Sequence, residues 1–174
     1  MSLKQKVIAI DGPSASGKGT VASRVAEALG FLYLDSGALY RLTALYAQKQ
    51  NVAWTDEDAV STLAETLPAQ FEGSAVLLNG EDVSEQIRTE AIGMGASAVA
   101  QLPKVRAALL QRQRDFLTEK GLVADGRDIG SVIFPDAALK IFLTASANVR
   151  AQRRAKQLGI PCEGVAFERI LSDI

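Results

Sequence analysis

Histidine is absent from the 174 residues, and cysteine occurs once, at Cys162. Without histidine, a Ser-His-Asp triad, a histidine base and a histidine metal ligand are excluded. A single cysteine excludes an intrachain disulfide, a zinc cluster and a CxxC redox pair, which fits a protein of the reducing cytoplasm. Any chemistry must therefore depend on Lys, Arg, Asp, Glu, hydroxyl groups and backbone amides, with a hard cation such as Mg²⁺ as the expected ion.

The sequence also has little net charge and no long apolar run. Nineteen Lys and Arg residues against 20 Asp and Glu give a net charge of −1. This balance argues against bulk electrostatic binding to nucleic acid or to an anionic membrane. No segment approaches the roughly 18 apolar residues that a transmembrane helix needs, and residues 1–6 lack the pattern of a signal peptide. We expect a cytoplasmic protein that holds any anion with a local cluster of side chains.

Short apolar strands alternate with helical patterns along most of the chain, which predicts an α/β fold with a parallel sheet. Strands are expected at 7–10, 31–34, 122–125 and 139–143, and helices at 17–29, 38–49, 56–67, 90–101, 103–119, 147–158 and 165–174. Residues 70–82 are β-prone and contain the hairpin dipeptide Asn79-Gly80. Because residues 69–95 break the alternation, we predict an insert there. The last helical pattern reaches residue 174 without a cap or breaker, so we expect a further C-terminal part.

A glycine-rich loop containing a lysine follows the first expected strand. Residues 12–20 are Gly-Pro-Ser-Ala-Ser-Gly-Lys-Gly-Thr. In such a loop the backbone amides and the helix N-terminus bind phosphate, and the lysine reaches the terminal phosphates of a nucleotide. The strict pattern has Ser or Thr directly after the lysine, whereas here Gly19 separates Lys18 from Thr20. Whether Thr20 contacts Mg²⁺ directly or through water stays open, and a solvated glycine-rich turn is the alternative interpretation of the loop.

A phosphate loop alone does not separate a kinase from a GTPase or an ATPase motor. No asparagine of the chain begins the Asn-Lys-x-Asp pattern that reads guanine. The chain is also small for a motor. A small-molecule kinase is therefore favoured.

Two segments, 91–114 and 137–162, contain Lys and Arg but neither Asp nor Glu. In the second, Arg150, Arg153 and Arg154 lie at i, i+3 and i+4 on one helix face. Like charges at this spacing destabilise a helix by about 0.2–0.5 kcal/mol per pair. A bound phosphate would remove this cost, since one guanidinium can bond two of its oxygens. A solvated basic face is the alternative.

On a helical wheel, Arg106 and Gln113 fall between two apolar groups of the helix expected at 103–119. A charge within an apolar arc should be paired or ligated. We therefore take Arg106 as a site candidate rather than a surface residue, with a structural ion pair as the alternative. Polar loops at 35–41 and 124–130 follow two other strands, and ligands of parallel α/β folds bind at this edge of the sheet.

Four motifs, in this order, resemble bacterial cytidylate kinases of the P-loop nucleoside monophosphate kinase family. They are Gly-Pro-Ser-x-x-Gly-Lys-Gly-Thr at 12–20, Leu-Asp-Ser-Gly-Ala-Leu-Tyr-Arg at 34–41, Asn-Gly-Glu-Asp-Val-Ser at 79–84 with Ile-Arg-Thr at 87–89, and Ala-Asp-Gly-Arg-Asp-Ile-Gly at 124–130. The resemblance implies a P-loop core at 1–68 and 96–174, a parallel sheet flanked by helices, an enlarged nucleoside-monophosphate-binding insert at 69–95 and a helical lid at about 146–164. It also implies an enzyme that transfers the γ-phosphoryl group of ATP to CMP or dCMP, for which we expect Mg²⁺ as the cofactor. We further expect a monomer.

The resemblance further implies roles for individual residues. ATP would be bound by Gly12, Pro13, Ser14, Ala15, Ser16, Gly17, Lys18, Gly19 and Thr20. The phosphate and ribose of CMP would be bound by Ser36, Tyr40, Arg41 and Arg127, and the cytosine by Ser97, Arg106 and Asp128. Catalysis would depend on Lys18, Arg127, Arg150 and Arg154, with Arg153 in the same lid. The alternatives are a small kinase for AMP, UMP or shikimate and a non-catalytic nucleotide-binding fragment.

Overall fold

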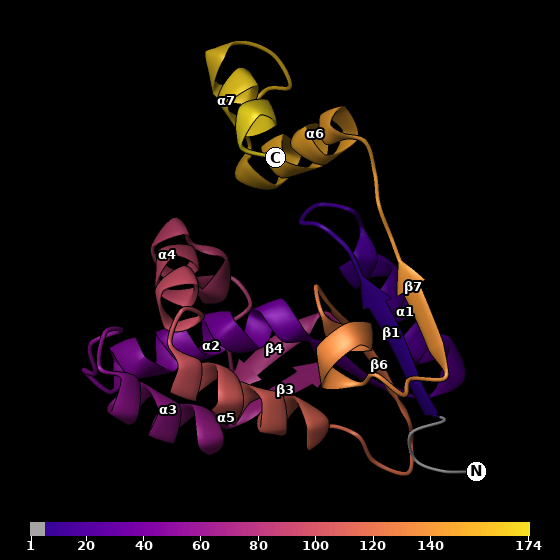
Figure 1. The fold of residues 1–174 in the computed structure, drawn as a ribbon. Helices are drawn as coiled ribbons and strands as arrows, with labels where there is room; N and C mark the ends of the chain where they lie inside the picture. The colour runs from indigo at the N-terminus through magenta and orange to yellow at the C-terminus, as the bar shows by residue number, and fades with distance from the viewer. Residues whose placement is uncertain (1–5) are drawn as a thin grey trace.

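A computed structural model describes residues 6–174 (Figure 1). Its main sheet is parallel, with the strand order β2–β6–β1–β7. The strands are β1 (Val7–Asp11), β2 (Leu32–Asp35), β6 (Leu122–Gly126) and β7 (Leu139–Phe142). The predicted α/β class with a parallel sheet flanked by helices is therefore confirmed, and the carboxyl ends of four strands meet at one edge.

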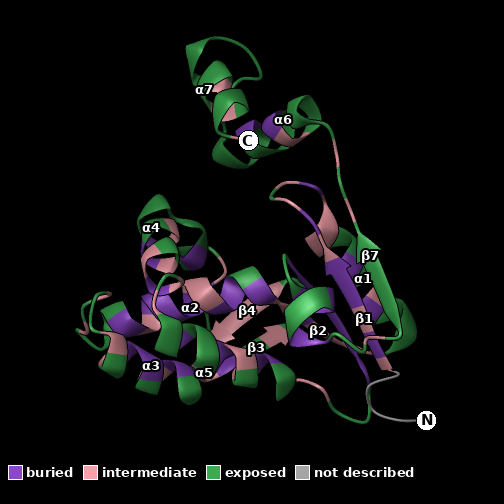
Figure 2. Ribbon diagram, in the orientation of Figure 1, coloured by how far each residue is buried: buried purple, intermediate pink, exposed green. Residues whose placement is uncertain are grey.

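Helices cover the two faces of this sheet with separate apolar clusters. On one face, α1 (Lys18–Leu29) packs Ala22 and Ala26 against Ile10 and Val123. The opposite face carries the larger cluster, in which α2 (Ser36–Lys49) and α5 (Pro103–Arg114) take part. Figure 2 shows the central strand β1 and the inner sides of these helices largely buried, whereas β7 at the edge of the sheet is exposed. Both faces of the central strands are thus covered, as their near-continuous apolar sequences require.

Helix boundaries differ from the predicted ones where local bonds end or extend a helix. The carboxylate of Asp35 accepts a hydrogen bond from the Ala38 amide at 2.9 Å, so α2 begins at Ser36 rather than at residue 38. At the other end of the fold, α5 ends at Arg114 rather than at 119. The Phe116 amide bonds the carbonyl of Gln113, three residues back, which tightens the last turn and stops the α-helix.

A second, antiparallel sheet contains β3 (Ala69–Glu72), β4 (Ala75–Leu78) and β5 (Glu81–Asp82). Asn79 and Gly80 have φ values of 54° and 78° between β4 and β5, the left-handed pair that their hairpin signature predicts. This sheet buries Ala69 and Leu78 in the larger cluster beside α2. The segment predicted as an insert therefore shares its core with the main body, and its limits at 69–95 stay a prediction.

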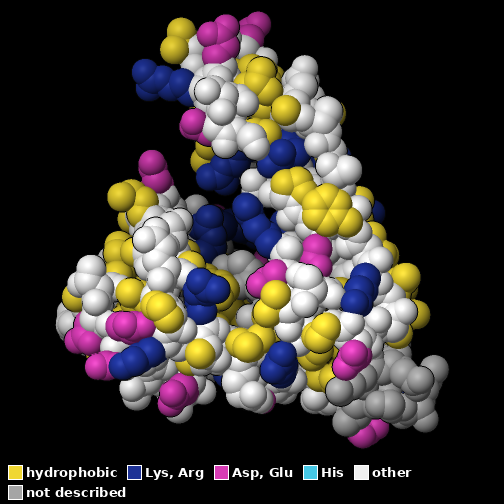
Figure 3. Space-filling view, in the orientation of Figure 1, with side chains coloured by type: hydrophobic (Ala, Val, Ile, Leu, Met, Phe, Trp, Pro, Cys, Tyr) yellow, Lys and Arg dark blue, Asp and Glu magenta, His cyan; other side chains and the backbone are white. Residues whose placement is uncertain are grey.

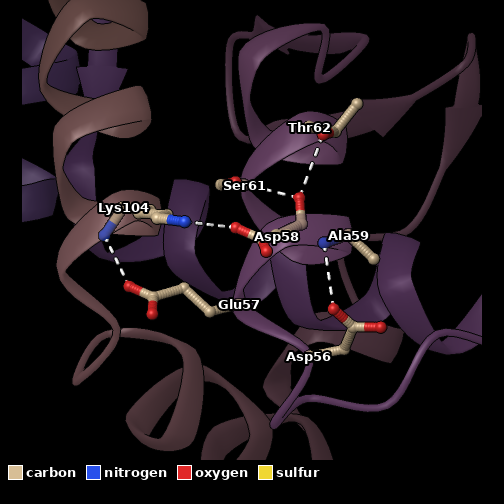
Figure 4. Close-up of polar contacts among 7 residues, drawn as sticks. All are labelled: Asp56, Glu57, Asp58, Ala59, Ser61, Thr62 and Lys104. Carbon is tan, nitrogen blue, oxygen red and sulfur yellow. Dashed lines mark hydrogen bonds and ion pairs between the residues drawn. The ribbon is translucent and has the colours of Figure 1, made fainter.

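Helices α3 (Glu57–Glu65) and α5 are joined at their N-terminal ends (Figure 4). The carboxylate of Glu57 accepts a hydrogen bond from the backbone amide of Lys104 at 2.8 Å. The ammonium group of Lys104 pairs with Asp58. A backbone amide in the first turn of α5, which has no partner within its own helix, thus donates to a side chain of α3. This bond holds in place the helix that carries Arg106.

The last two helices, α6 (Ala147–Leu158) and α7 (Val165–Asp173), form a hairpin that stands away from the body (Figure 1). Only Ala151 and Ala155 of α6 are buried, and α7 has no buried residue. Across the gap lie α2 and α4 (Glu90–Val99), preceded by the short helix η2 (Gln86–Arg88). Within residues 6–174, no helix is both long and apolar enough to cross a membrane.

Candidate active site

The loop between β1 and α1 has the curled backbone of a phosphate loop. Ala15 and Gly17 are left-handed, with φ values of 57° and 94°. A Cβ atom at Gly12 would lie 2.1 Å from the Leu143 carbonyl oxygen, so no larger residue fits there. The ammonium group of Lys18 folds back over the loop and donates to the Pro13 carbonyl at 3.2 Å. Successive amides in such a turn form a concavity that suits an anion.

Ser16 adds a side-chain donor to this loop. The residue is 4% exposed, and its hydroxyl has no hydrogen-bond partner in the described part of the chain. A buried polar group without a partner costs about 1–3 kcal/mol. A phosphate oxygen in the loop would satisfy it.

Three carboxylates that were not predicted as site residues lie beneath the phosphate loop. Asp11, Asp35 and Asp125 stand at the ends of β1, β2 and β6, and the strand register places Asp35 directly beside Asp125. Burial, followed by the negative charge of Asp35, raises the pKa of Asp125 to about 7, while Lys18 opposes this shift. Burial also raises the pKa of Asp35. The sequence carried one signal for these residues, because each of the three strands has an aspartate at its last or next-to-last position.

Asp11 holds the loop that leaves β6. Its two carboxylate oxygens accept hydrogen bonds from the amides of Ile129 and Gly130, both at 2.8 Å. These bonds begin the π-helical turn η3 (Ile129–Ile133), which the sequence did not predict. The same bonds place Arg127 and Asp128, both exposed, directly before that turn.

Several residues predicted to bind CMP come together around Asp128 of this loop. Burial and then the charge of Asp128 raise the pKa of Tyr40, while Arg106 opposes the shift, so three elements bring these side chains within electrostatic reach. The Arg41 guanidinium donates to the Ile87 carbonyl at 2.7 Å and lies against Gly93 of α4. Because Asp35 caps α2, it sets the position of both Tyr40 and Arg41.

The prediction that Arg106 lies inside an apolar arc is wrong. Arg106 is exposed, and Gln113 occupies the polar position within the buried face of α5, with 1% exposure. The buried residues of α5 are Val105, Leu109 and Gln113, whereas the Arg106 side chain is exposed and lies near Tyr40. Arg106 stays a site candidate because it lies near Tyr40, and not because it is buried.

Two other predicted CMP ligands, Ser97 and Ser36, lie on α4 and at the start of α2. The Ser97 hydroxyl donates to the Gly93 carbonyl of its own helix at 3.1 Å and is exposed. Ser36 is buried at the first position of α2. Their roles stay predictions.

The arginines of α6 divide between the phosphate loop and the body. Arg150 donates to the Ser14 carbonyl at 2.9 Å, and Arg153 donates to the Ser16 carbonyl at 2.7 Å. Arg154 instead lies close enough to Arg41 that, after burial, it lowers the pKa of that guanidinium. Two arginines from opposite sides of the gap thus face each other.

Positive side chains gather around the hollow between the α6–α7 hairpin and the body (Figure 3). None of the ion pairs between described residues includes Lys18 or one of the arginines just named. Unpaired cations facing one hollow repel one another, and an anion with several oxygens would relieve that repulsion. The arrangement therefore suits a ligand that carries phosphates.

The residues present also fit a magnesium ion that arrives with a nucleotide. Between residues 6 and 174, no group of three or more His, Cys, Asp or Glu could hold a metal by itself. Mg²⁺, however, is usually held by one or two carboxylates, waters and the phosphates of the substrate. The Asp125 carboxylate beside Lys18 fits that donor set, while Thr20 is exposed on the first turn of α1.

Known proteins are similar in sequence to this chain over almost its whole length. The family model described as cytidylate kinase matches residues 8–174. A cytidylate kinase of Neisseria meningitidis is 81% identical over 171 residues, covering 98% of this chain and 78% of the relative. Those of Chromobacterium violaceum and Pseudomonas syringae are 61% and 55% identical, covering 97% and 100% of this chain and 76% and 79% of the relatives.

Proposed function

The chain belongs to the cytidylate kinase family and phosphorylates CMP, and we propose that it does so by transferring the γ-phosphoryl group of ATP across the hollow beneath α6. The comparisons give no support to AMP, UMP or shikimate as acceptors, or to a fragment without activity. One observation carries the proposal: arginines of α6 bond the phosphate loop and Arg154 of the same helix faces Arg41 of the body, where positive side chains surround a hollow (Figure 3).

On the donor side, the phosphate loop would bind the ATP phosphates. Lys18 would leave the Pro13 carbonyl, its partner at 3.2 Å, and contact the terminal phosphates. When bound, Mg²⁺ supplies positive charge that neutralises phosphate oxygens. Asp125 and the hydroxyl of Thr20 are the groups of this chain that would hold it. Phosphoryl transfer needs alignment and charge neutralisation more than covalent help, which is what this loop offers.

On the acceptor side, Arg41 and Arg127 would bind the phosphate of CMP, with Ser36 and Tyr40 at the phosphate and ribose. Arg106 and Asp128 would contact cytosine, together with Ser97. Arg and Asp suit this task because a cytosine ring offers both an acceptor edge and an amino donor. Asp128 and Arg106 both shift the pKa of Tyr40, so the three side chains lie close together, which supports the placement of one ligand among them.

The α6 arginines would complete the site. Arg150 and Arg153 now bond carbonyls of the phosphate loop, and Arg154 faces Arg41. With both nucleotides bound, Arg150 and Arg154 would neutralise the transferring phosphoryl group. Such a closed lid excludes water and so limits the hydrolysis of ATP. A cytoplasmic monomer that also accepts dCMP is part of the proposal, and its single cysteine is consistent with that compartment.

The test is the formation of ADP from Mg²⁺-ATP by this chain with CMP, dCMP, AMP, UMP or no acceptor. We expect rapid turnover with CMP, weaker turnover with UMP and almost none without an acceptor. Lys18→Ala is the matched control for a contaminating kinase, since it should remove the activity in every reaction. Turnover that is fastest with AMP, or no turnover with CMP, would contradict the proposed function.

A further inference from the structure

The phosphate loop lacks a hydroxyl directly after its lysine, and the space beside that position is polar. A Cβ atom built on Gly19 would lie 3.5 Å from the Tyr33 hydroxyl and 3.8 Å from Oδ2 of Asp125. A side chain at this position would therefore point at a phenol and a carboxylate. In the strict loop pattern, the Ser or Thr hydroxyl at this position contacts Mg²⁺.

The Tyr33 phenol is bonded to that carboxylate. It donates to Oδ2 of Asp125 at 2.6 Å, a bond that joins neighbouring strands β2 and β6. A carboxylate oxygen only accepts hydrogen bonds, so the phenol is the donor of this bond. A short bond from a neutral hydroxyl to a carboxylate is of the stronger, charge-assisted kind.

The ring of Tyr33 is fixed independently of its hydroxyl. It meets Phe71 of β3 edge-on, with 6.2 Å between centroids, and Phe71 packs against Phe116 at 5.7 Å. Arg112 stacks over Phe116 in turn, 5.2 Å from the ring centroid. Aromatic pairs of this geometry hold their partners in place. The hydroxyl is therefore presented to Asp125 by a rigid chain of rings and could be removed without moving the ring.

We propose that Tyr33 is a positioning residue whose hydroxyl lies in the space left open beside Gly19 and holds Asp125 oriented toward Mg²⁺ and the phosphates of ATP. The inference rests on the proposed function, because it requires that the loop bind Mg²⁺-ATP. Tyr33 acts through Asp125 and touches neither substrate. Only the Mg²⁺-dependent part of nucleotide binding should then depend on the phenol.

The experiment compares Tyr33→Phe with the unaltered chain by calorimetry, using a non-hydrolysable ATP analogue with Mg²⁺ and, separately, with EDTA. We expect about a tenfold loss of affinity with Mg²⁺, the size of one hydrogen bond to a charged group, and no change in EDTA. The ring contacts with Phe71 persist in this variant. Its thermal midpoint of unfolding is therefore measured as a control, since a lower midpoint would show that the substitution damages the fold.

A second substitution tests directly whether a hydroxyl bonded to Asp125 is what matters. A serine hydroxyl one bond beyond the Cβ position of Gly19 comes within hydrogen-bond reach of Asp125 once the phenol is gone. Gly19→Ser in the Tyr33→Phe background should therefore restore most of the Mg²⁺-dependent affinity. Gly19→Ala in the same background fills the space without a hydroxyl and should restore none.

Each other outcome overturns the inference. An equal loss with Mg²⁺ and with EDTA would mean that Tyr33 serves the fold alone, and an unchanged affinity would mean that its hydroxyl does not act on the site. Equal rescue by serine and alanine would assign the effect to packing. If the unaltered chain does not bind the analogue with Mg²⁺, the proposed function fails together with the inference.

Discussion

Replacing Asp125 by asparagine should stabilise the folded protein above neutral pH while removing its activity. Asp125 is 3% exposed and lies beside Asp35 on the next strand. Its pKa is raised from 3.8 to about 7, mainly by burial and then by Asp35. A tenfold change in a protonation equilibrium corresponds to about 1.4 kcal/mol, so ionised Asp125 costs the folded state at most about 4 kcal/mol.

The sign of the pH dependence follows from this shift. The folded protein binds the Asp125 proton more tightly than the unfolded chain does. The resulting stabilisation is fully present below about pH 3.8 and is lost as the pH rises through about 7. Asparagine has the same shape, carries no charge and can still accept the hydrogen bond from the Tyr33 hydroxyl, but it loses the electrostatic attraction to Lys18. We therefore expect a net gain of about 2 kcal/mol at pH 8 and little gain at pH 4.5.

The measurement is thermal unfolding followed by circular dichroism, in EDTA, at pH 4.5 and pH 8. A gain of about 2 kcal/mol should raise the midpoint by about 4–8 °C in a protein of this size. Asp173→Asn, at an exposed position of α7, is the matched control for the loss of one negative charge. A lower midpoint for Asp125→Asn at pH 8, or the same gain at both pH values, would refute the reasoning.

Three further substitutions test the site. Lys18→Ala should lower kcat by about 10²–10³ at an unchanged thermal midpoint, and near-normal turnover would contradict the phosphate-loop assignment. Arg106→Met should raise KM for CMP far more than KM for ATP, and equal effects in steady-state assays would remove Arg106 from cytosine binding. Asp11→Ala leaves two amides unpaired at about 1–3 kcal/mol each, so urea unfolding should show a loss of stability. The same variant should bind CMP less tightly by calorimetry because the loop of Arg127 and Asp128 is released.

The main sheet could be predicted because its strands are short apolar runs that end at polar loops. The hairpin at Asn79-Gly80 was equally visible, since few residue pairs tolerate two successive left-handed conformations. The turn η3 was not visible, because it is held by Asp11, which is 118 residues away from Ile129 in the chain. A long-range bond of this kind leaves no local pattern in the sequence.

The candidate site was predicted unevenly for the same reason. Motifs identified the phosphate loop, but the proximity of Asp35 and Asp125 depends on strand register, which periodicity does not give. The helical wheel found the polar interruption of α5 but not which residue is buried. Packing against neighbouring elements buries Gln113 and leaves Arg106 exposed.

The site without ligands holds like charges together on both of its sides. Asp35 faces Asp125 beneath the phosphate loop, and Arg41 faces Arg154 across the hollow. Lys18 offsets only part of the repulsion between the carboxylates, and no ion pair between described residues includes any of these four side chains. Phosphates would neutralise the arginines, and a cation bound with them would neutralise the carboxylates, so a nucleotide with its metal relieves both sides. Because a ligand stabilises the state that binds it, metal and nucleotide together should raise the thermal midpoint by more than the sum of their separate effects.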